Sequence, residues 1–177
     1  PSVAVDVVID QSGNLRRRLD DRQLDITLMT CSGKVIPVDA EILLTEQIVW
    51  AGAKGGCAHM RQPLPVSLWE EGCAWRIRAL DALSASGRDY RIAYMSAHTS
   101  GQRSAILADL AVAPLPKSFI GDDIVALGPR DGLPDLGTYN LVMIVRPDAS
   151  APVRAAADHI RATMEAFKEK GRFAMAA

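Results

Sequence analysis

Aromatic residues are scarce in this chain of 177 residues, and neither sign of charge dominates. Phe, Trp and Tyr make up 5% of the chain, which is too little for a platform on which nucleic-acid bases stack. Lys and Arg number 20 while Asp and Glu number 21, which gives a formal net charge of −1. Because phosphate binding needs clustered basic side chains, this balance argues against a nucleic-acid surface on this chain.

Long apolar runs and paired cysteines are also lacking. No stretch approaches the roughly 18–20 apolar residues of a membrane span, and the residues after Pro1 contain neither the basic region nor the apolar core of a signal peptide. The sequence begins without an initiator Met and passes at once into a strand-like pattern, which is typical of a fragment of a longer chain. The lack of a long apolar run predicts no membrane partner. Cys31, Cys57 and Cys73 are odd in number and irregularly spaced, which favours free thiols in a reducing cytoplasm.

The patterns that are present alternate between strand and helix. The β-branched, apolar run Val3–Ile9 predicts a buried strand, followed by a helix over Asn14–Arg22 with Ser12 as its N-cap and a strand over Leu24–Met29. This order predicts a parallel strand–helix–strand unit. The same patterns predict further strands over Glu41–Ala53, Leu64–Leu68, Tyr90–Met95, Leu110–Leu115, Ile124–Leu127 and Asn140–Val145. They also predict three further helices: one over Cys73–Ser86, which ends at Gly87, one from the turn Ser96–Ser100 to Leu110, and one over Ala151–Glu169.

Repeated alternation of strand and helix predicts an α/β fold. The chain becomes loop-rich near residues 53–65 and again near 128–140. Two such connections predict two lobes, of which one is discontinuous. Residues 1–52 and 141–177 are expected to form the first lobe, and residues 53–140 the second.

Two polar turns are the candidate ligand contacts. Gln11-Ser12-Gly13 follows the first predicted strand, and Ser96-Ala97-His98-Thr99-Ser100 follows the strand over Tyr90–Met95. Ligands of parallel sheets lie beyond the carboxyl ends of the strands, where helix N-termini offer free N–H groups to a carboxylate. The alternative is that Ser12 and either Thr99 or Ser100 only cap helices, and that His98 is a solvated turn residue.

No catalytic or cofactor-binding motif is present. The chain has no G-x-S-x-G elbow, no H-E-x-x-H, no P-loop and no G-x-G-x-x-G. A metal site built on Cys57, His59 and Cys73 would match no familiar ligand spacing, so these residues are interpreted as ordinary packing residues. We therefore expect no cofactor, no metal and no enzymatic activity.

The order of motifs resembles the effector-binding (substrate-binding) domain of LysR-type transcriptional regulators, a bacterial family. Ser12-x-x-Leu15 through Leu24-Asp25-Ile26-Thr27-Leu28 is similar to the family's "S-x-x-L … G-x-L-D-L-A-L" segment. The resemblance continues to about residue 169, through Glu46-Gln47-Ile48-Val49-Trp50-Ala51 ("E-x-L-V-W-V"), Pro63-Leu64, Gly72-Cys73-Ala74-Trp75-Arg76, Gly87-Arg88-Asp89-Tyr90, Leu110-Ala111-Val112-Ala113-Pro114-Leu115-Pro116 and Gly132-Leu133-Pro134.

The resemblance implies a fold, a function and partners. The fold would be two Rossmann-like lobes joined by two crossover strands, as in type 2 periplasmic binding proteins. The implied activity is binding of a small effector in the interlobe cleft. The candidate contact residues are small and polar, which favours an organic acid or a polar metabolite as that effector. By position, Ser12 and the turn Ser96–Ser100 would contact the effector, with Gln11 beside Ser12, and Thr30 would lie at the edge of that site. The family acts as a homodimer or tetramer.

The sequence departs from the family pattern in three places. It contains no winged helix-turn-helix, so binding to promoter DNA would need a segment that this sequence does not include. The first strand and helix of the first lobe have no counterpart, which would leave a neighbouring strand unpaired. Asp109-Leu110 stands where the family usually has Gly-Leu, and Asp adopts a positive φ less easily than Gly.

Two other classes of protein share the expected architecture. A periplasmic solute-binding protein is one alternative, but it needs a signal peptide, and three unpaired cysteines suit an oxidising compartment poorly. An enzyme on the same two-lobe scaffold is the other, and it needs an acid–base pair or a nucleophile at recognisable spacing.

Overall fold

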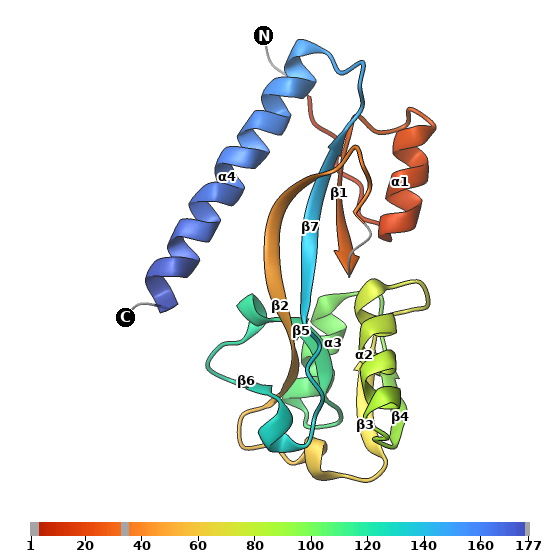
Figure 1. Cartoon of the computed structure of the whole chain (residues 1–177), viewed down its shortest axis with the longest axis vertical. Helices are drawn as coiled ribbons and strands as arrows, with labels where there is room; N and C mark the ends of the chain where they lie inside the picture. The colour runs from red at the N-terminus through yellow and green to blue at the C-terminus, as the bar shows by residue number, and fades with distance from the viewer. Residues whose placement is uncertain (1–3, 33–35, 176–177) are drawn as a thin grey trace. The chain divides into compact units, whose positions relative to one another are not determined.

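The computed structural model describes residues 4–32 and 36–175, and it divides the chain into two compact units. Unit 1 comprises Pro1–Thr45 and Asn140–Ala177, and unit 2 comprises Glu46–Tyr139. Figure 1 shows the elements in chain order: α1 (Ser12–Asp20), β1 (Ile26–Ser32), β2 (Glu41–Ala53), β3 (Leu64–Leu68), α2 (Ala74–Ala85), β4 (Tyr90–Met95), α3 (Thr99–Leu107), β5 (Ala113–Pro116), β6 (Ile124–Leu127), β7 (Thr138–Val145) and α4 (Ala151–Met175).

Unit 1 is built on strands β1 and β7, which are neighbours in the sheet, and on the first part of β2. One cluster of buried side chains joins Leu19 of α1 to Met29, Val142 and Ile144 of the strands. A second cluster joins Ala157 of α4 to the strands through Leu43 and Met143. Burial of these apolar side chains holds both helices against the sheet.

Unit 2 contains the rest of β2, which pairs with both β5 and β6 in antiparallel register. Strands β3 and β4 pair in parallel, and α2 connects them. All five residues of β3 are buried, as expected of a strand covered on both faces. Trp50 lies in the core of this unit and donates its indole N–H to the carbonyl of Pro134 at 3.0 Å.

Most of the strand predictions are confirmed. The bounds of β2, β3, β4 and β6 coincide with the predicted segments. Strand β1 starts and ends later than predicted, β5 begins at Ala113, and β7 begins at Thr138. Helix α2 is one residue shorter at each end, and Gly87 follows its C-cap at φ +64°, as its predicted role as the helix stop requires.

The strand predicted over Val3–Ile9 is wrong for residues 4–9, while Val3 lies outside the described residues. The first strand–helix–strand unit built on that strand is also wrong. Residues 4–10 have no regular secondary structure, and their side chains are exposed. A β-branched sequence tolerates a strand conformation, but a neighbouring chain must supply the ladder hydrogen bonds. No segment among residues 4–32 and 36–175 pairs with residues 4–10.

The helix starts also differ from the predictions. Helix α1 begins at Ser12 instead of Asn14 and ends at Asp20, and α3 runs from Thr99 only to Leu107. Helix α4 continues past the predicted end at Glu169, to Met175. In the part of the chain that the structure describes, no helix is long and apolar enough to span a bilayer.

Candidate functional site

The first candidate group, in unit 1, centres on Ser12 at the start of α1. The Ser12 Oγ accepts the backbone N–H of Thr30 at 3.2 Å and lies 3.4 Å from the Thr30 Oγ1. Both side chains are half-buried. The two predicted residues are therefore in direct contact, and they present two hydroxyl groups beside a helix N-terminus.

Gln11 is the N-cap residue of α1, and its carbonyl accepts the N–H of Leu15 at 3.0 Å. No side chain caps this helix start, so the alternative that Ser12 is the N-cap is wrong. The carboxylate of Asp10 accepts the amide of Asn14 and the backbone N–H of Gln11. These two bonds, in that order, hold the pKa of the Asp10 carboxyl below its usual value.

The second candidate group, in unit 2, is the turn that joins β4 to α3. The Ser96 Oγ accepts the N–H of His98 at 3.1 Å and donates to the carbonyl of His98 at 3.2 Å. His98 is the N-cap of α3, and Thr99 and Ser100 are the first two residues of the helix. Since no side chain caps α3 either, the interpretation of Thr99 or Ser100 as a cap is also wrong.

Gln102 fixes the position of this turn, and it is not among the residues predicted from the sequence. Its side chain is fully buried, its Nε2 donates to the carbonyl of Ser96 at 2.9 Å, and its Oε1 accepts the hydroxyl of Ser67 on β3. A Cβ on Gly101 would meet the Ser96 Oγ and come to 2.7 Å from the Ser96 Cβ, so this helix position needs glycine. These contacts support the turn that precedes Thr99 and Ser100 at the start of α3.

Both groups have the chemistry of an anion-binding helix start. The first N–H groups of an α-helix have no partner within the helix, and the helix dipole makes that end electropositive. Hydroxyl groups of Ser12 and Thr30 lie beside one such end, and Ser96, Thr99 and Ser100 lie at the other. A carboxylate suits such donors because it accepts several hydrogen bonds at once.

The three cysteines were considered above as free thiols and, with His59, as a possible metal site. Among the described residues, no three side chains of His, Cys, Asp and Glu gather as metal ligands, and all three cysteines are free thiols. Cys57 donates its thiol to the carboxylate of Asp109 at 3.3 Å. Burial raises the pKa of the Cys31 thiol.

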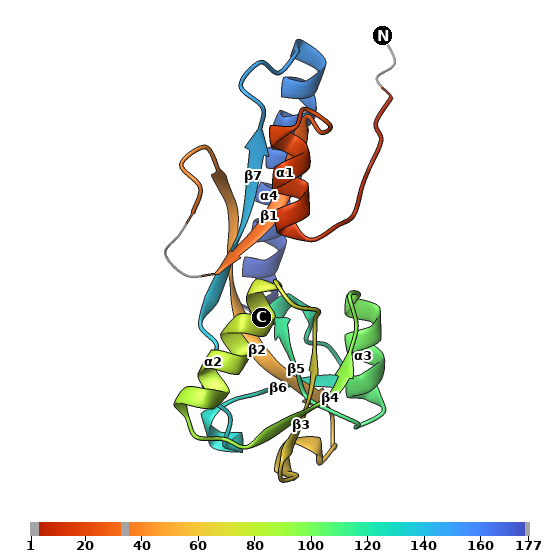
Figure 2. The same cartoon turned by 90° about the vertical axis from the view of Figure 1, so that its right-hand side faces the viewer.

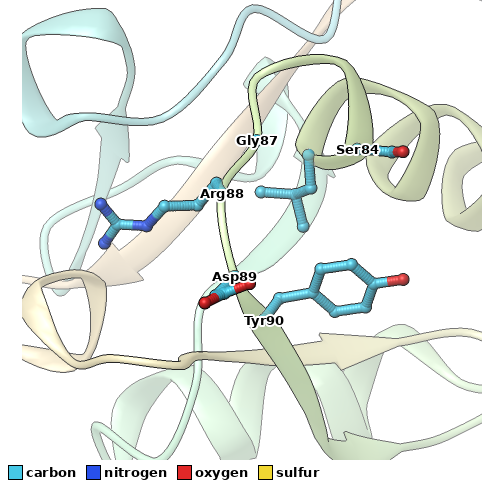
Figure 3. A pocket seen from close by; sticks show the side chains of 6 residues that line it. Ser84, Gly87, Arg88, Asp89 and Tyr90 are labelled. Atoms are coloured by element: carbon cyan, nitrogen blue, oxygen red, sulfur yellow. The ribbon is translucent and has the colours of Figure 1, made fainter.

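A cavity of about 300 Å³ lies elsewhere in unit 2, at the end of α2. Its lining comprises Leu83, Ser84, Gly87, Arg88, Asp89 and Tyr90, and none of the predicted site residues is among them. Figure 3 shows that the Arg88 and Tyr90 side chains point to opposite sides of the chain. Arg88 donates instead to the carbonyl of His59 at 2.8 Å, so its charge is used inside unit 2.

The fold is that of a type 2 periplasmic-binding-protein-like domain, and structures of regulatory domains share it. The regulatory domain of HypT from Salmonella typhimurium, with bromide bound, matches with a TM-score of 0.73 and 12% identity over 89% of this chain and 80% of that one. The CcmR regulatory domain of Synechocystis PCC6803, in complex with 2-PG, matches with a TM-score of 0.65 and 14% identity, covering 87% of this chain and 80% of that one.

Sequence comparison identifies the family. The model of the LysR substrate binding domain matches residues 1–165, and the chain belongs to that family. It is 29% identical over 168 residues to the HTH-type transcriptional regulator DgdR of Burkholderia cepacia, covering 93% of this chain and 55% of DgdR. It is 23% identical to PecT of Dickeya dadantii (strain 3937), covering 84% of this chain and 46% of PecT. The chain thus spans about half the length of these relatives.

Proposed function

We propose that this chain is the effector-sensing part of a DNA-binding transcriptional regulator, and that its effector is a small organic acid or polar metabolite. The observation that carries the proposal is the family match over residues 1–165. The uncapped starts of α1 and α3, with their neighbouring hydroxyl groups, support an anionic or hydroxylated ligand. Neighbours solved with bromide and with 2-PG bound support the same type of ligand.

The proposal assigns effector contacts to Ser12, with Gln11 and Thr30 beside it, and to Ser96, His98, Thr99 and Ser100. An effector shifts a regulator only if it binds one conformation better than another. In this proposal the domain acts by binding and not by catalysis, and it needs no cofactor or metal. It works in the cytoplasm, where promoter DNA is. It also works as a homodimer or tetramer.

We expect Ser12→Ala and Thr99→Ala each to weaken effector binding by about 10-fold or more, because each removes a hydrogen bond to a charged group. Isothermal titration calorimetry with an organic acid that binds the unmodified chain measures the effect. Thr163→Ala is the matched control, since its hydroxyl donates to the carbonyl of His159 within α4. Equal affinity in all three variants would remove Ser12 and Thr99 from the site.

This chain by itself is expected to show no sequence-specific DNA affinity. Its net charge is −1, whereas binding to DNA phosphates needs an excess of clustered basic side chains. A gel-shift assay at low salt with promoter and scrambled duplexes measures the difference. Tight binding to one duplex only would contradict the assignment of DNA binding to a segment outside this sequence.

A further inference from the structure

Within unit 2, the chain reverses its direction across the sheet at the carboxyl ends of β3 and β4. Helix α2 leads from β3 to β4, and α3 leads from β4 back to Val112, which pairs with Val66 on the other side of β3. Because such connections are right-handed, the two helices cover opposite faces of the strands. Figure 2 shows α2 and α3 on opposite sides of this pair. Parallel sheets bind ligands where adjacent strands send their connections to opposite faces.

Arg76, in the first turn of α2, lies at these strand ends. Its Nη1 donates to the carbonyl of Trp69, the residue after β3, at 2.9 Å, and to the sulfur of Met95, the last residue of β4, at 3.6 Å. The carbonyl of Leu68 at the end of β3 accepts the N–H of Ser96, the residue after Met95, at 3.1 Å. The guanidinium therefore lies against the same two strand ends that position the candidate turn beginning at Ser96.

The Arg76 charge has no acidic partner in the part of the chain that the structure describes, since no ion pair there includes it. Both of its contacts use Nη1. A guanidinium has five N–H bonds, so the side formed by Nε and Nη2 keeps its hydrogens for a ligand. That side matches the two oxygens of a carboxylate. The side chain is half-buried, where a charge interacts more strongly than in bulk water.

Arg78, two residues further along α2, is used inside the fold. Its Nε donates to the carbonyl of Leu136 at 2.7 Å, and a Cβ on Gly137 would meet its Nη2. Arg78 therefore holds the loop that precedes β7. Of these two arginines, Arg76 is the one at the strand ends.

We propose that Arg76 binds a carboxylate of the effector through Nε and Nη2, while Thr99 and Ser100 at the start of α3 supply neutral donors to the same ligand. The inference rests on the proposed function and deepens it, because it assigns the charge that recognises the effector to one residue of unit 2. A neutral ligand of the same shape leaves the half-buried guanidinium without a charged partner. The site therefore selects an ionised carboxylate over the corresponding amide.

An NMR titration of the complete 177-residue chain with sodium acetate tests this role, with acetamide as the neutral counterpart and the ionic strength held constant. We expect acetate to shift the Nε–H resonance of Arg76 and the amides of Ser96–Ser100 with one dissociation constant, and acetamide to shift neither. Arg76→Gln is expected to weaken acetate binding by about 10-fold or more, since it removes charge-assisted hydrogen bonds. Arg76→Lys keeps the charge and loses the planar fork, so it is expected to weaken binding less than Arg76→Gln.

Arg130→Gln is the matched control, because it removes the same charge from an exposed arginine near the opposite end of β4. Arg130 lies two residues before Gly132, and a Cβ on Gly132 would come to 3.5 Å from Arg88, which precedes β4. Acetate that shifts the amides of Ser96–Ser100 equally in the unmodified chain and in Arg76→Gln overturns the role of Arg76 and leaves the turn as an effector contact. Amides that respond to neither probe in the unmodified chain overturn the inference together with the proposed contacts of the turn.

Discussion

Replacing Asp109 by Ala is expected to lower the free energy of unfolding by about 2–4 kcal/mol, because two unfavourable changes coincide. Asp109 has a φ of +49°, a conformation that costs alanine more than aspartate or glycine. Its carboxylate accepts the backbone N–H groups of Cys57 and Ala58 at 3.1 and 2.9 Å and the Arg61 guanidinium at 3.0 Å. Alanine loses these bonds and the one from the Cys57 thiol, and it keeps the strained backbone.

Two further variants separate these contributions. Asp109→Gly relieves the backbone but loses the bonds, so we expect a loss of about 1–2 kcal/mol, which is smaller than that of Asp109→Ala. Asp109→Asn keeps part of the hydrogen bonding and removes the charge. Urea unfolding monitored by circular dichroism measures all three variants. If the glycine and alanine variants are equally stable, the positive φ contributes nothing.

The Asp109 contribution also depends on pH. Burial raises the pKa of the Asp109 carboxyl, but the N–H groups of Cys57 and Ala58, the Cys57 thiol and the Arg61 charge outweigh burial and lower it overall. A lowered pKa in the folded state stabilises the fold above the ordinary value of about 4, and this contribution is lost as the pH falls through the folded-state pKa. The stability difference between the unmodified chain and Asp109→Asn is therefore expected to shrink at acid pH.

Gln102→Leu is expected to lower the free energy of unfolding by about 2–4 kcal/mol, since it leaves one buried and one half-buried polar group without the glutamine partner. These groups are the hydroxyl of Ser67, which is itself fully buried, and the carbonyl of Ser96. Leucine has nearly the volume of glutamine, so the loss comes from hydrogen bonding and not from a cavity. The exchange rate of the amides at residues 96–98 is expected to rise, because their turn loses its support.

The double variant Ser67→Ala/Gln102→Leu is the control for this interpretation. It removes the orphaned hydroxyl, so it is expected to be about 1–2 kcal/mol more stable than Gln102→Leu alone. Thermal and urea unfolding of the four members of this cycle give the coupling energy. A double variant whose losses simply add would contradict a direct bond between the two side chains.

The sequence predicts the strands of unit 2 well because their patterns are unambiguous. β2, β3 and β4 are bounded by turn residues and are rich in residues that favour strands, and their observed bounds match the predictions. Residues 4–10 have the same composition and yet form no strand, because pairing depends on a neighbour that composition does not reveal. Asp109 stands where the family usually has glycine, and it still adopts a positive φ. Its carboxylate stabilises this conformation by accepting backbone N–H groups such as that of Ala58.

The candidate site was predictable only in part. The two polar turns follow from their positions between strands and helices, and the structure brings Ser12 and Thr30 into contact. The bond from Ser96 to His98 and the buried Gln102 depend on tertiary packing that spacing does not fix. One feature of the sequence could have pointed to Gln102. It lies three and four residues before Ala105 and Ile106, on the apolar face of a short helix.

The most direct test of the central claim is the melting temperature of this chain against a panel of organic acids and polar metabolites. A ligand that binds only the folded state raises the melting temperature in proportion to its concentration and affinity. We predict a concentration-dependent rise with at least one member of the panel, and a smaller rise in Ser12→Ala. A folded chain whose melting temperature no member changes, or a rise that is identical in Ser12→Ala and Thr99→Ala, would contradict the account.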